Sequence, residues 1–231
     1  MLPYFRSLIS RMRRHILFHT PMRNRILPRW PFMMSAQQLC LLCSKLEETR
    51  HIKGAILEVG VAAGFTTMFL KKYMDSAGIE KRYICIDTFA GFTKEDIAVE
   101  VSTRGKKRSD YAAAFSINSK AWFDEAMRIN GIGRVESYRA DAGTFEYSKL
   151  GPLAFCLCDV DLFRPTSRAL PRIFDQLSPG GILIVDDCDE NDYLWNGAAQ
   201  AYREFIASIG LPKRIVLGKL GLIAKPGLIP N

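Results

Sequence analysis

Four aspartates close two apolar segments in the second half of the chain. They are Asp159 and Asp161 after residues 153–158, and Asp186 and Asp187 after residues 182–185. If the two segments are neighbouring parallel strands joined by a right-handed crossover, the four carboxylates meet at one edge of a sheet. Their mutual repulsion favours a bound cation, and hard oxygen ligands in that number suit Mg²⁺ or a similar divalent ion. The alternative is that Asp186 and Asp187 only begin a solvated loop.

A turn containing two glycines follows an earlier apolar segment, with the sequence EVGVAAG over residues 58–64. Glycine lets the backbone turn close to a ligand before a helix begins. Glu58 is placed to accept a hydrogen bond from such a ligand or from its ammonium group. The turn lacks the GxGxxG spacing of dinucleotide sites, and glycines such as Gly60 and Gly64 also occur where a chain only turns.

Asp87 directly follows the apolar residues 83–86. An acidic residue at the end of a second strand is well placed to bind both hydroxyls of a ribose. The alternative is that Asp87 caps a turn or a helix.

The segments that carry these residues alternate between strand and helix patterns. We expect strands at 55–59, 83–86, 134–138, 153–158 and 182–185, and helices at 66–74, 119–128, 165–177 and 198–209, after an earlier helix that Ser35 and Gln38 open as a capping box. Residues 214–217 and 220–224 then suggest a closing hairpin. Continuous apolar runs indicate strands buried on both faces. The sequence therefore predicts an α/β fold: a doubly wound, mostly parallel sheet with an antiparallel C-terminal hairpin and an N-terminal helical extension.

The chain has 231 residues, 48% of them hydrophobic, which is enough for one well-filled domain. Its net charge of +8 lies almost entirely in the first 30 residues, which hold seven arginines and no acidic residue, so that 8 minus 7 leaves +1 for the rest. We therefore divide the chain into a basic arm with its linker, residues 1–31, and a domain, residues 32–231. The nearly neutral charge of the domain argues against nucleic acid as a partner.

Apolar residues recur at helical spacing in the arm, with arginines between them. They are Phe5, Leu8, Ile9, Met12 and Ile16. Such an amphipathic helix packs on its own domain, on a second copy of the chain in a homo-oligomer, or on an anionic membrane surface. We expect a cytoplasmic protein, with the membrane surface as a further location; a mitochondrial transit peptide is the alternative use of an arginine-rich start.

The six cysteines are interpreted as small core residues of a protein in a reducing compartment. Zinc is disfavoured, because no histidine accompanies the Cys40/Cys43 pair or the Cys156/Cys158 pair.

The stretch 159–187, DVDLFRPTSRALPRIFDQLSPGGILIVDD, resembles the signature of the macrocin O-methyltransferase family, sugar-modifying enzymes of antibiotic biosynthesis. The segments FMMSAQQL (32–39), LEVGVAAG (57–64) and DTFAGF (87–92) resemble that family in the same order. The resemblance covers about residues 32–225 and implies a Rossmann-like methyltransferase domain. The family more often has glycine at Val160, tyrosine at Phe163 and a second glycine at Phe65.

The resemblance also implies ligands for particular residues. It places S-adenosylmethionine near Glu58, Gly60, Gly64 and Asp87, with Ser119 and Asp141 as weaker candidates, and magnesium on Asp159, Asp186 and Asp187. Asp161 matches the position that acts as general base in some members. Others use a histidine, but all three histidines of this chain precede the first strand, which favours Asp161 here.

We therefore expect a Mg²⁺-dependent transfer of a methyl group from S-adenosylmethionine to a hydroxyl of a sugar or sugar-bearing metabolite. A catechol-type O-methyltransferase is the nearest alternative, but that family tends to have a lysine base and an asparagine ligand where Leu162 and Asp187 stand. A non-catalytic module that binds membrane or nucleic acid through the arm is the alternative of another class. The acceptor pocket is expected in residues 91–115 and 188–196, where Tyr193 and Trp195 either stack on a ring or fill space.

Overall fold

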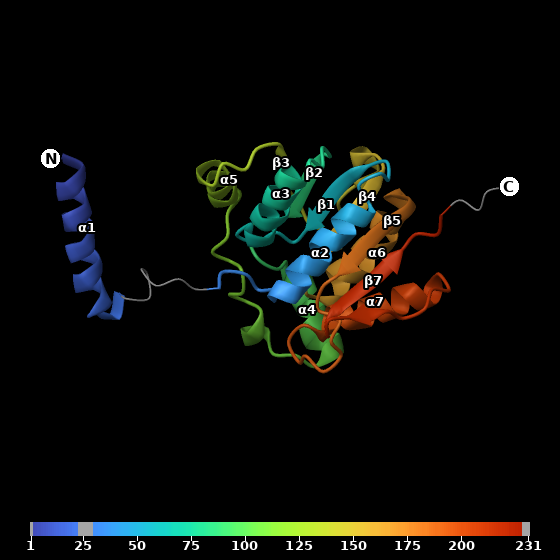
Figure 1. Cartoon of the computed structure of the whole chain (residues 1–231). Helices are drawn as coiled ribbons and strands as arrows, with labels where there is room; N and C mark the ends of the chain where they lie inside the picture. The colour runs from blue at the N-terminus through green and yellow to red at the C-terminus, as the bar shows by residue number, and fades with distance from the viewer. Residues whose placement is uncertain (1, 23–29, 228–231) are drawn as a thin grey trace. The chain divides into compact units, whose positions relative to one another are not determined.

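The structure is a computed structural model that describes residues 2–22 and 30–227. The chain divides into two compact units, Met1–Met33 and Met34–Asn231. The first unit contains one long helix, α1 (Leu2–Phe18), in the part of the chain where the amphipathic pattern predicts it (Figure 1). Within the described residues, no helix combines the length and the apolarity needed to cross a bilayer.

The second unit is built on one sheet of seven strands in the order β3-β2-β1-β4-β5-β7-β6. The strands are β1 (Ala55–Val59), β2 (Tyr83–Asp87), β3 (Val135–Arg139), β4 (Leu153–Cys158), β5 (Leu177–Val185), β6 (Ile215–Val216) and β7 (Leu220–Ala224). The first five in this order are parallel, and β7 runs antiparallel between β5 and β6. The predicted α/β fold with its antiparallel C-terminal hairpin is therefore confirmed.

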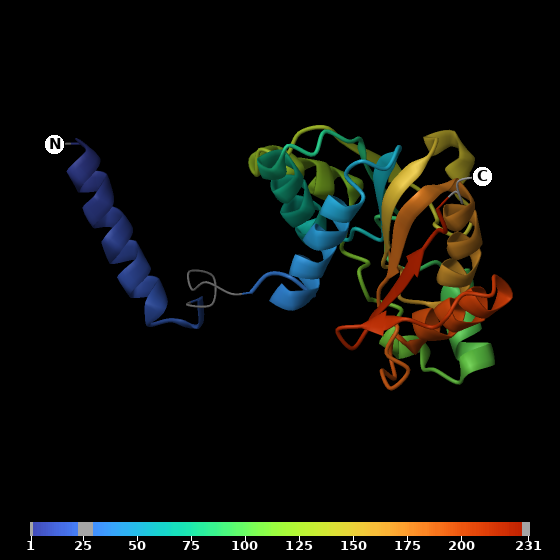
Figure 2. The same cartoon turned by 45° about the vertical axis from the view of Figure 1, so that its right-hand side comes forward.

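Helices cover both faces of this sheet. They are α2 (Ala36–Glu48), α3 (Phe65–Ala77), α4 (Lys94–Arg104), α5 (Lys120–Ile129), α6 (Phe163–Gln176) and α7 (Asn196–Ser208), with short 3₁₀ turns at η2 (Arg108–Asp110) and η3 (Tyr147–Leu150). Figures 1 and 2 show α2 and α3 on one face and α6 and α7 on the other. The expected capping box opens α2: Gln38 donates its N–H to Ser35 Oγ at 3.3 Å, and Ser35 donates its N–H to Gln38 Oε1 at 2.7 Å.

Burial of the central strands explains their continuous apolar sequences. Every residue of β1 and β4 is buried. On one face, side chains such as Leu57 and Leu183 form a core with Leu170 and Ile173 of α6 and Phe205 of α7. Burial of one such side chain contributes about 1.5–3 kcal/mol. This core fixes the strands whose carboxyl ends carry the candidate site.

Most expected helices and strands agree with the structure to within three residues at each end, but two elements differ more. The helix α4 lies in a segment for which the sequence predicts no helix. Its buried face includes the charged residue Glu100 as well as Ile97, and this charge hides the apolar periodicity. The strand β5 begins at Leu177, five residues before the expected start, because Leu177 pairs with Leu153 across an irregularity in the β4–β5 ladder.

The prediction that the cysteines are core residues is correct for five of them and wrong for one. All six cysteines are free thiols; Cys43, Cys85, Cys156, Cys158 and Cys188 are buried, whereas Cys40 is exposed. Cys40 lies on α2 one position after the buried Leu39 and so falls on the outward face of this helix.

Gly54, directly before β1, tests the packing of this sheet. Its φ is +130°, and an added Cβ would lie 2.5 Å from the carbonyl oxygen of Pro152. We expect Gly54→Ala to lower the free energy of unfolding by about 2–4 kcal/mol, because both strain and a backbone clash oppose the methyl group. Gly133 has an ordinary φ and no atom within 4 Å of an added Cβ, so Gly133→Ala is the matched control. Urea unfolding measures both, and equal stabilities would contradict this account.

Candidate active site

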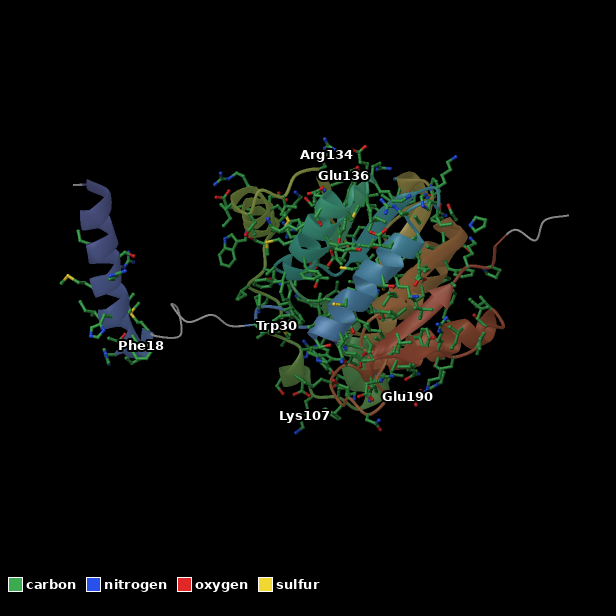
Figure 3. All side chains as sticks on the ribbon, in the orientation of Figure 1. Phe18, Trp30, Lys107, Arg134, Glu136 and Glu190 are labelled. Atoms are coloured by element: carbon green, nitrogen blue, oxygen red, sulfur yellow. The ribbon has the colours of Figure 1, made fainter. Side chains whose placement is uncertain are left out.

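The carboxyl ends of the five parallel strands lie at one edge of the sheet, and hydrogen bonds continue from strand to strand beyond the last paired residues. Gly60 donates its N–H to a carbonyl of β2 at 2.8 Å, Asp159 donates to β1 at 2.8 Å, and Asp186 donates to β4 at 2.9 Å. Figure 3 shows Glu190, which follows β5, at the opposite end of this unit from Arg134, which precedes β3. The loops that carry the candidate residues are therefore held together at one edge.

Three of the four aspartates point at one another. Asp159, Asp161 and Asp187 each offer a carboxylate oxygen, and these oxygens all lie within 4.8 Å of one another. Asp161 and Asp187 hold left-handed backbone conformations, with φ of 62° and 56°. Such conformations cost energy for a residue other than glycine and tend to persist at functional sites.

The carboxylates perturb one another strongly. Burial, followed by the charge of Asp186, raises the pKa of Asp159 well above its ordinary value, and burial and Asp187 do the same to the pKa of Asp161. Burial and Asp187 raise the pKa of Asp186 to about 6. Four ionised groups are thus costly here without a positive charge, and the donor set consists of the hard oxygen ligands that Mg²⁺ prefers.

Lys219, in the turn between β6 and β7, is a residue of this site that the sequence interpretation missed. Its Nζ donates to Asp186 Oδ2 at 2.9 Å and to Asp187 Oδ1 at 3.0 Å. Asp186 Oδ1 also accepts the N–H of Asp187 at 2.8 Å, so both of its oxygens are engaged. The expected C-terminal hairpin could have indicated Lys219. An antiparallel strand beside β5 begins next to the end of β5, so the residue just before that strand lies close to Asp186 and Asp187. The ligand set Asp159, Asp186 and Asp187 stays a prediction.

The two glycines of the 58–64 turn are required by the structure. Gly60 has a φ of +83°, and an added Cβ would lie 1.6 Å from the carbonyl oxygen of Asp159. Gly64 has a φ of +84° at the start of α3, and its Cβ would meet Met127 at 2.6 Å and Phe123 at 2.8 Å. The turn therefore lies directly against the loop that carries the acidic cluster.

Asp87 organises this turn. Its Oδ2 accepts the N–H groups of Val61 at 2.8 Å and Ala62 at 2.9 Å, and its Oδ1 accepts the N–H of Phe89 at 2.6 Å. The capping role given above as an alternative is thus present, and binding of a ribose by Asp87 stays a prediction.

Glu58 is buried beneath the turn, with an exposed fraction of only 2%. Thr67 Oγ1 and Tyr83 Oη both donate to its Oε2 at 2.7 Å. Burial raises the pKa of Glu58 to about 7 despite these two hydrogen bonds. A contact of Glu58 with a ligand stays a prediction.

The two weaker candidates make local hydrogen bonds. Ser119 caps α5, accepting the N–H of Trp122 on Oγ at 3.2 Å. Asp141, which follows β3, accepts the N–H of Gly143 on Oδ1 at 2.7 Å. Both contacts are compatible with a purely structural role.

The two segments expected to build the acceptor pocket touch through aromatic side chains. The ring centroid of Trp195 lies 6.0 Å from that of Phe92, 5.9 Å from that of Tyr111 and 6.3 Å from that of Phe115. Trp195 thus fills space between the segments. Tyr193 is 53% exposed, and the ammonium of Lys106 lies 3.9 Å from its ring centroid.

A comparison with protein families tests the resemblance to the macrocin O-methyltransferases. The sequence profile of the macrocin-O-methyltransferase (TylF) family matches residues 32–216, which is most of the chain. The chain belongs to this family. The resemblance described above is confirmed, and all strands from β1 to β6 lie within the matched range.

One curated relative of this macrocin-O-methyltransferase family member is distant. A Streptomyces olivaceus protein, 8-demethyl-8-(2,3-dimethoxy-alpha-L-rhamnosyl)-tetracenomycin-C 4'-O-methyltransferase, is 26% identical over 141 residues, which are 59% of this chain and 53% of the relative. The chain thus spans about half the length of this curated relative.

Two solved structures share the fold of this family member. The O-methyltransferase NovP is 16% identical with a TM-score of 0.70, over 86% of this chain and 83% of NovP. The calicheamicin methyltransferase CalS11 is 19% identical with a TM-score of 0.64, over 92% of this chain and 90% of CalS11. At these identities the likeness shows the Rossmann-like methyltransferase fold alone.

The buried Glu58 predicts a pH dependence of stability. The folded state binds the Glu58 proton more tightly than the unfolded state, whose pKa is near 4.5, so stability falls as the pH rises from about 4.5 to about 7. Glu58→Gln carries no charge and avoids this loss, so we expect its stability relative to the wild type to increase by about 2–3 kcal/mol between pH 4.5 and pH 8. Urea unfolding over this range measures the difference.

The control for this experiment is Glu80→Gln, at an exposed position. Its stability relative to the wild type should stay constant over the same range. A Glu58→Gln profile parallel to that of the wild type would contradict the raised pKa.

Proposed function

We propose that the chain transfers a methyl group from S-adenosylmethionine to a hydroxyl of a sugar or sugar-bearing metabolite, with Mg²⁺ or a similar divalent cation. One observation carries the proposal: in a chain of this family, carboxylate oxygens of Asp159, Asp161 and Asp187 lie within 4.8 Å of one another, beside a turn that requires glycine. Methyl transfer from a sulfonium requires that the methyl donor and the acceptor are oriented toward each other. The acidic loops after β4 and β5 and the neighbouring 58–64 turn offer adjoining sites for the acceptor and the donor.

The turn at residues 58–64 is the proposed site for the methyl donor. Binding is proposed to involve Glu58, Gly60, Gly64 and Asp87, with contributions from Ser119 and Asp141. The position supports this, because ligands of open α/β sheets bind outside the carboxyl ends of the strands, and the N-terminus of α3 follows directly. Asp87 holds the N–H groups of Val61 and Ala62 and so fixes the shape of the turn.

The acidic cluster is the proposed metal site, with Asp159, Asp186 and Asp187 as ligands. Its hard oxygen donors and raised pKa values fit a divalent cation. A bound Mg²⁺ would lower the pKa of an acceptor hydroxyl and stabilise developing negative charge.

Asp161 is the proposed general base, taking the proton from the acceptor hydroxyl as the methyl group transfers. Its position is fixed by neighbouring elements. Ala198 of α7 donates its N–H to the carbonyl of Asp161 at 3.2 Å, and the buried Glu100 accepts the N–H of Phe163 at 2.7 Å at the start of α6. These contacts hold the left-handed backbone of Asp161 in place.

A sugar acceptor is favoured over a catechol. The name of the Streptomyces olivaceus relative describes methylation of a rhamnosyl group, and the family is named for methylation of macrocin. The comparable positions here, Leu162 and Asp187, lack the lysine and asparagine that catechol-type enzymes tend to have. A free-hydroxyl sugar and a catechol, assayed side by side, separate the two activities.

Asp161→Asn tests the general base. We expect methyl transfer from S-adenosylmethionine to fall by about 10²–10⁴-fold, because an amide cannot accept the proton. Binding of S-adenosylmethionine, measured by calorimetry, should stay within about twofold of the wild type, because the proposed donor site lies on other loops.

Asp175→Asn is the matched control, since Asp175 is an exposed aspartate at the end of α6. The wild type with EDTA should be inactive and should recover with MgCl₂. Full activity of Asp161→Asn would show that Asp161 is not the general base. Full activity in EDTA would show that the reaction needs no divalent cation.

We also propose that the arm lies on an anionic membrane surface. In α1, Ile9, Met12 and Ile16 are exposed and recur at helical spacing, while Arg11 and Arg13 are exposed between them. The first 30 residues contain no acidic side chain to repel lipid phosphates. An apolar stripe that enters the headgroup region between arginines that pair with phosphate is the pattern of an interfacial helix.

Ile16→Glu tests this surface, with Ser10→Glu as the matched control. Both substitutions add one negative charge at an exposed position of α1, but only Ile16 belongs to the apolar stripe. We expect Ile16→Glu to lower the partition coefficient onto phosphatidylglycerol-containing vesicles at least about tenfold more than Ser10→Glu. Cosedimentation measures both. The proposal would be contradicted if the two variants bound equally, or if the wild type bound pure phosphatidylcholine vesicles as well as phosphatidylglycerol-containing vesicles.

A further inference from the structure

Lys219 places a fixed positive charge against the acidic cluster. Its backbone is held by neighbouring elements: the carbonyl of Lys219 accepts the N–H of Cys188 at 2.7 Å, and the carbonyl of Leu217 accepts a hydrogen bond from Gln38 of α2 at 3.3 Å. The turn itself uses left-handed backbone at Leu217 and Gly218, with φ of 50° and 82°. The backbone that carries the Lys219 ammonium is therefore held in a defined turn.

The contacts of Lys219 divide the cluster into two parts. Asp186, with an exposed side-chain fraction of 3%, has one oxygen on Lys219 and the other on the N–H of Asp187. Asp187 has one oxygen on Lys219 and also faces Asp159 and Asp161. Lys219 thus compensates the Asp186 side of the cluster, while the oxygens of the other three aspartates face one another.

We infer that Lys219 is a positioning residue that serves as the counter-ion of the metal-free site and competes with the divalent cation for Asp186 and Asp187. This inference rests on the proposed metal-dependent function. The buried Asp186 and Asp187 at the end of β5 repel each other. The Lys219 ammonium between them offsets this repulsion and so stabilises the folded site when no metal ion is bound. A divalent ion on the same carboxylates experiences repulsion from this ammonium, which lowers its affinity.

The inference predicts opposite effects on metal affinity and on metal-free stability. Lys219→Met should tighten binding of Mg²⁺ by about tenfold or more, because a like charge beside the ion is removed. The same substitution should lower the melting temperature in EDTA by more than about 4 °C, because the buried Asp186 loses its partner. A purely structural lysine would lower stability without tightening metal binding.

The test is calorimetric titration of the full-length chain with MgCl₂, together with thermal unfolding in EDTA. Lys219→Arg keeps the charge and should stay close to the wild type in both measurements. Lys213→Met is the matched control, because Lys213 precedes the same hairpin but pairs with the exposed Glu190. A Lys219→Met variant that folds only in MgCl₂ shows the predicted effect in its extreme form. If it does not fold at all, Lys219→Gln, which keeps an N–H donor without the charge, replaces it.

The outcomes separate this inference from the proposed function. If the wild type binds no divalent cation, the metal-dependent function fails, and the inference fails with it. If the wild type binds Mg²⁺ and the neutral variants bind it equally or more weakly, Lys219 does not compete, and the proposed function stands without the inference. Tighter binding by the neutral variants, with the Lys213→Met control unchanged, supports it.

Discussion

Repulsion among the carboxylates at the ends of β4 and β5 is the constraint on which the structure of this site depends. Parallel pairing of the two strands brings the half-buried Asp159 and Asp161 beside the buried Asp186 and Asp187 at one edge of the sheet. Burial and mutual repulsion raise the cost of these negative charges, and protons, the Lys219 ammonium or a metal ion would each offset that cost. The same closeness that makes the cluster costly makes it a set of ligands for a divalent cation.

The sequence predicts the fold well because burial on both faces leaves an unbroken apolar signal. The expected strands 55–59 and 153–158 coincide with β1 and β4, and the expected helix 119–128 corresponds to α5, with Ser119 at its N-cap. It also predicts which residues reach the carboxyl edge, since Asp87, Asp159 and Asp186 each directly follow an apolar run. The helix α4 was missed because Glu100 replaces an apolar residue on its inward face.

Contacts between distant segments could not be predicted with the same certainty. Sequence pattern places Asp87 at the end of β2, but only the structure shows that its carboxylate holds the backbone of Val61 and Ala62. Sequence pattern places Lys219 in a hairpin turn, but its partners depend on the register of β7 against β5. In both cases one polar side chain determines the local arrangement. An isolated polar residue is not part of a periodic hydrophobic pattern, so the sequence pattern does not reveal its partners.

A crystal structure of the chain grown with MnCl₂ and S-adenosylhomocysteine tests whether these aspartates bind a divalent cation. We expect one anomalous manganese peak in the acidic cluster, about 2.0–2.4 Å from carboxylate oxygens that include those of Asp159 and Asp187, with the cofactor product against the 58–64 turn. A cluster without a manganese peak, while the product is bound at the turn, would contradict the proposal that these aspartates form a metal site.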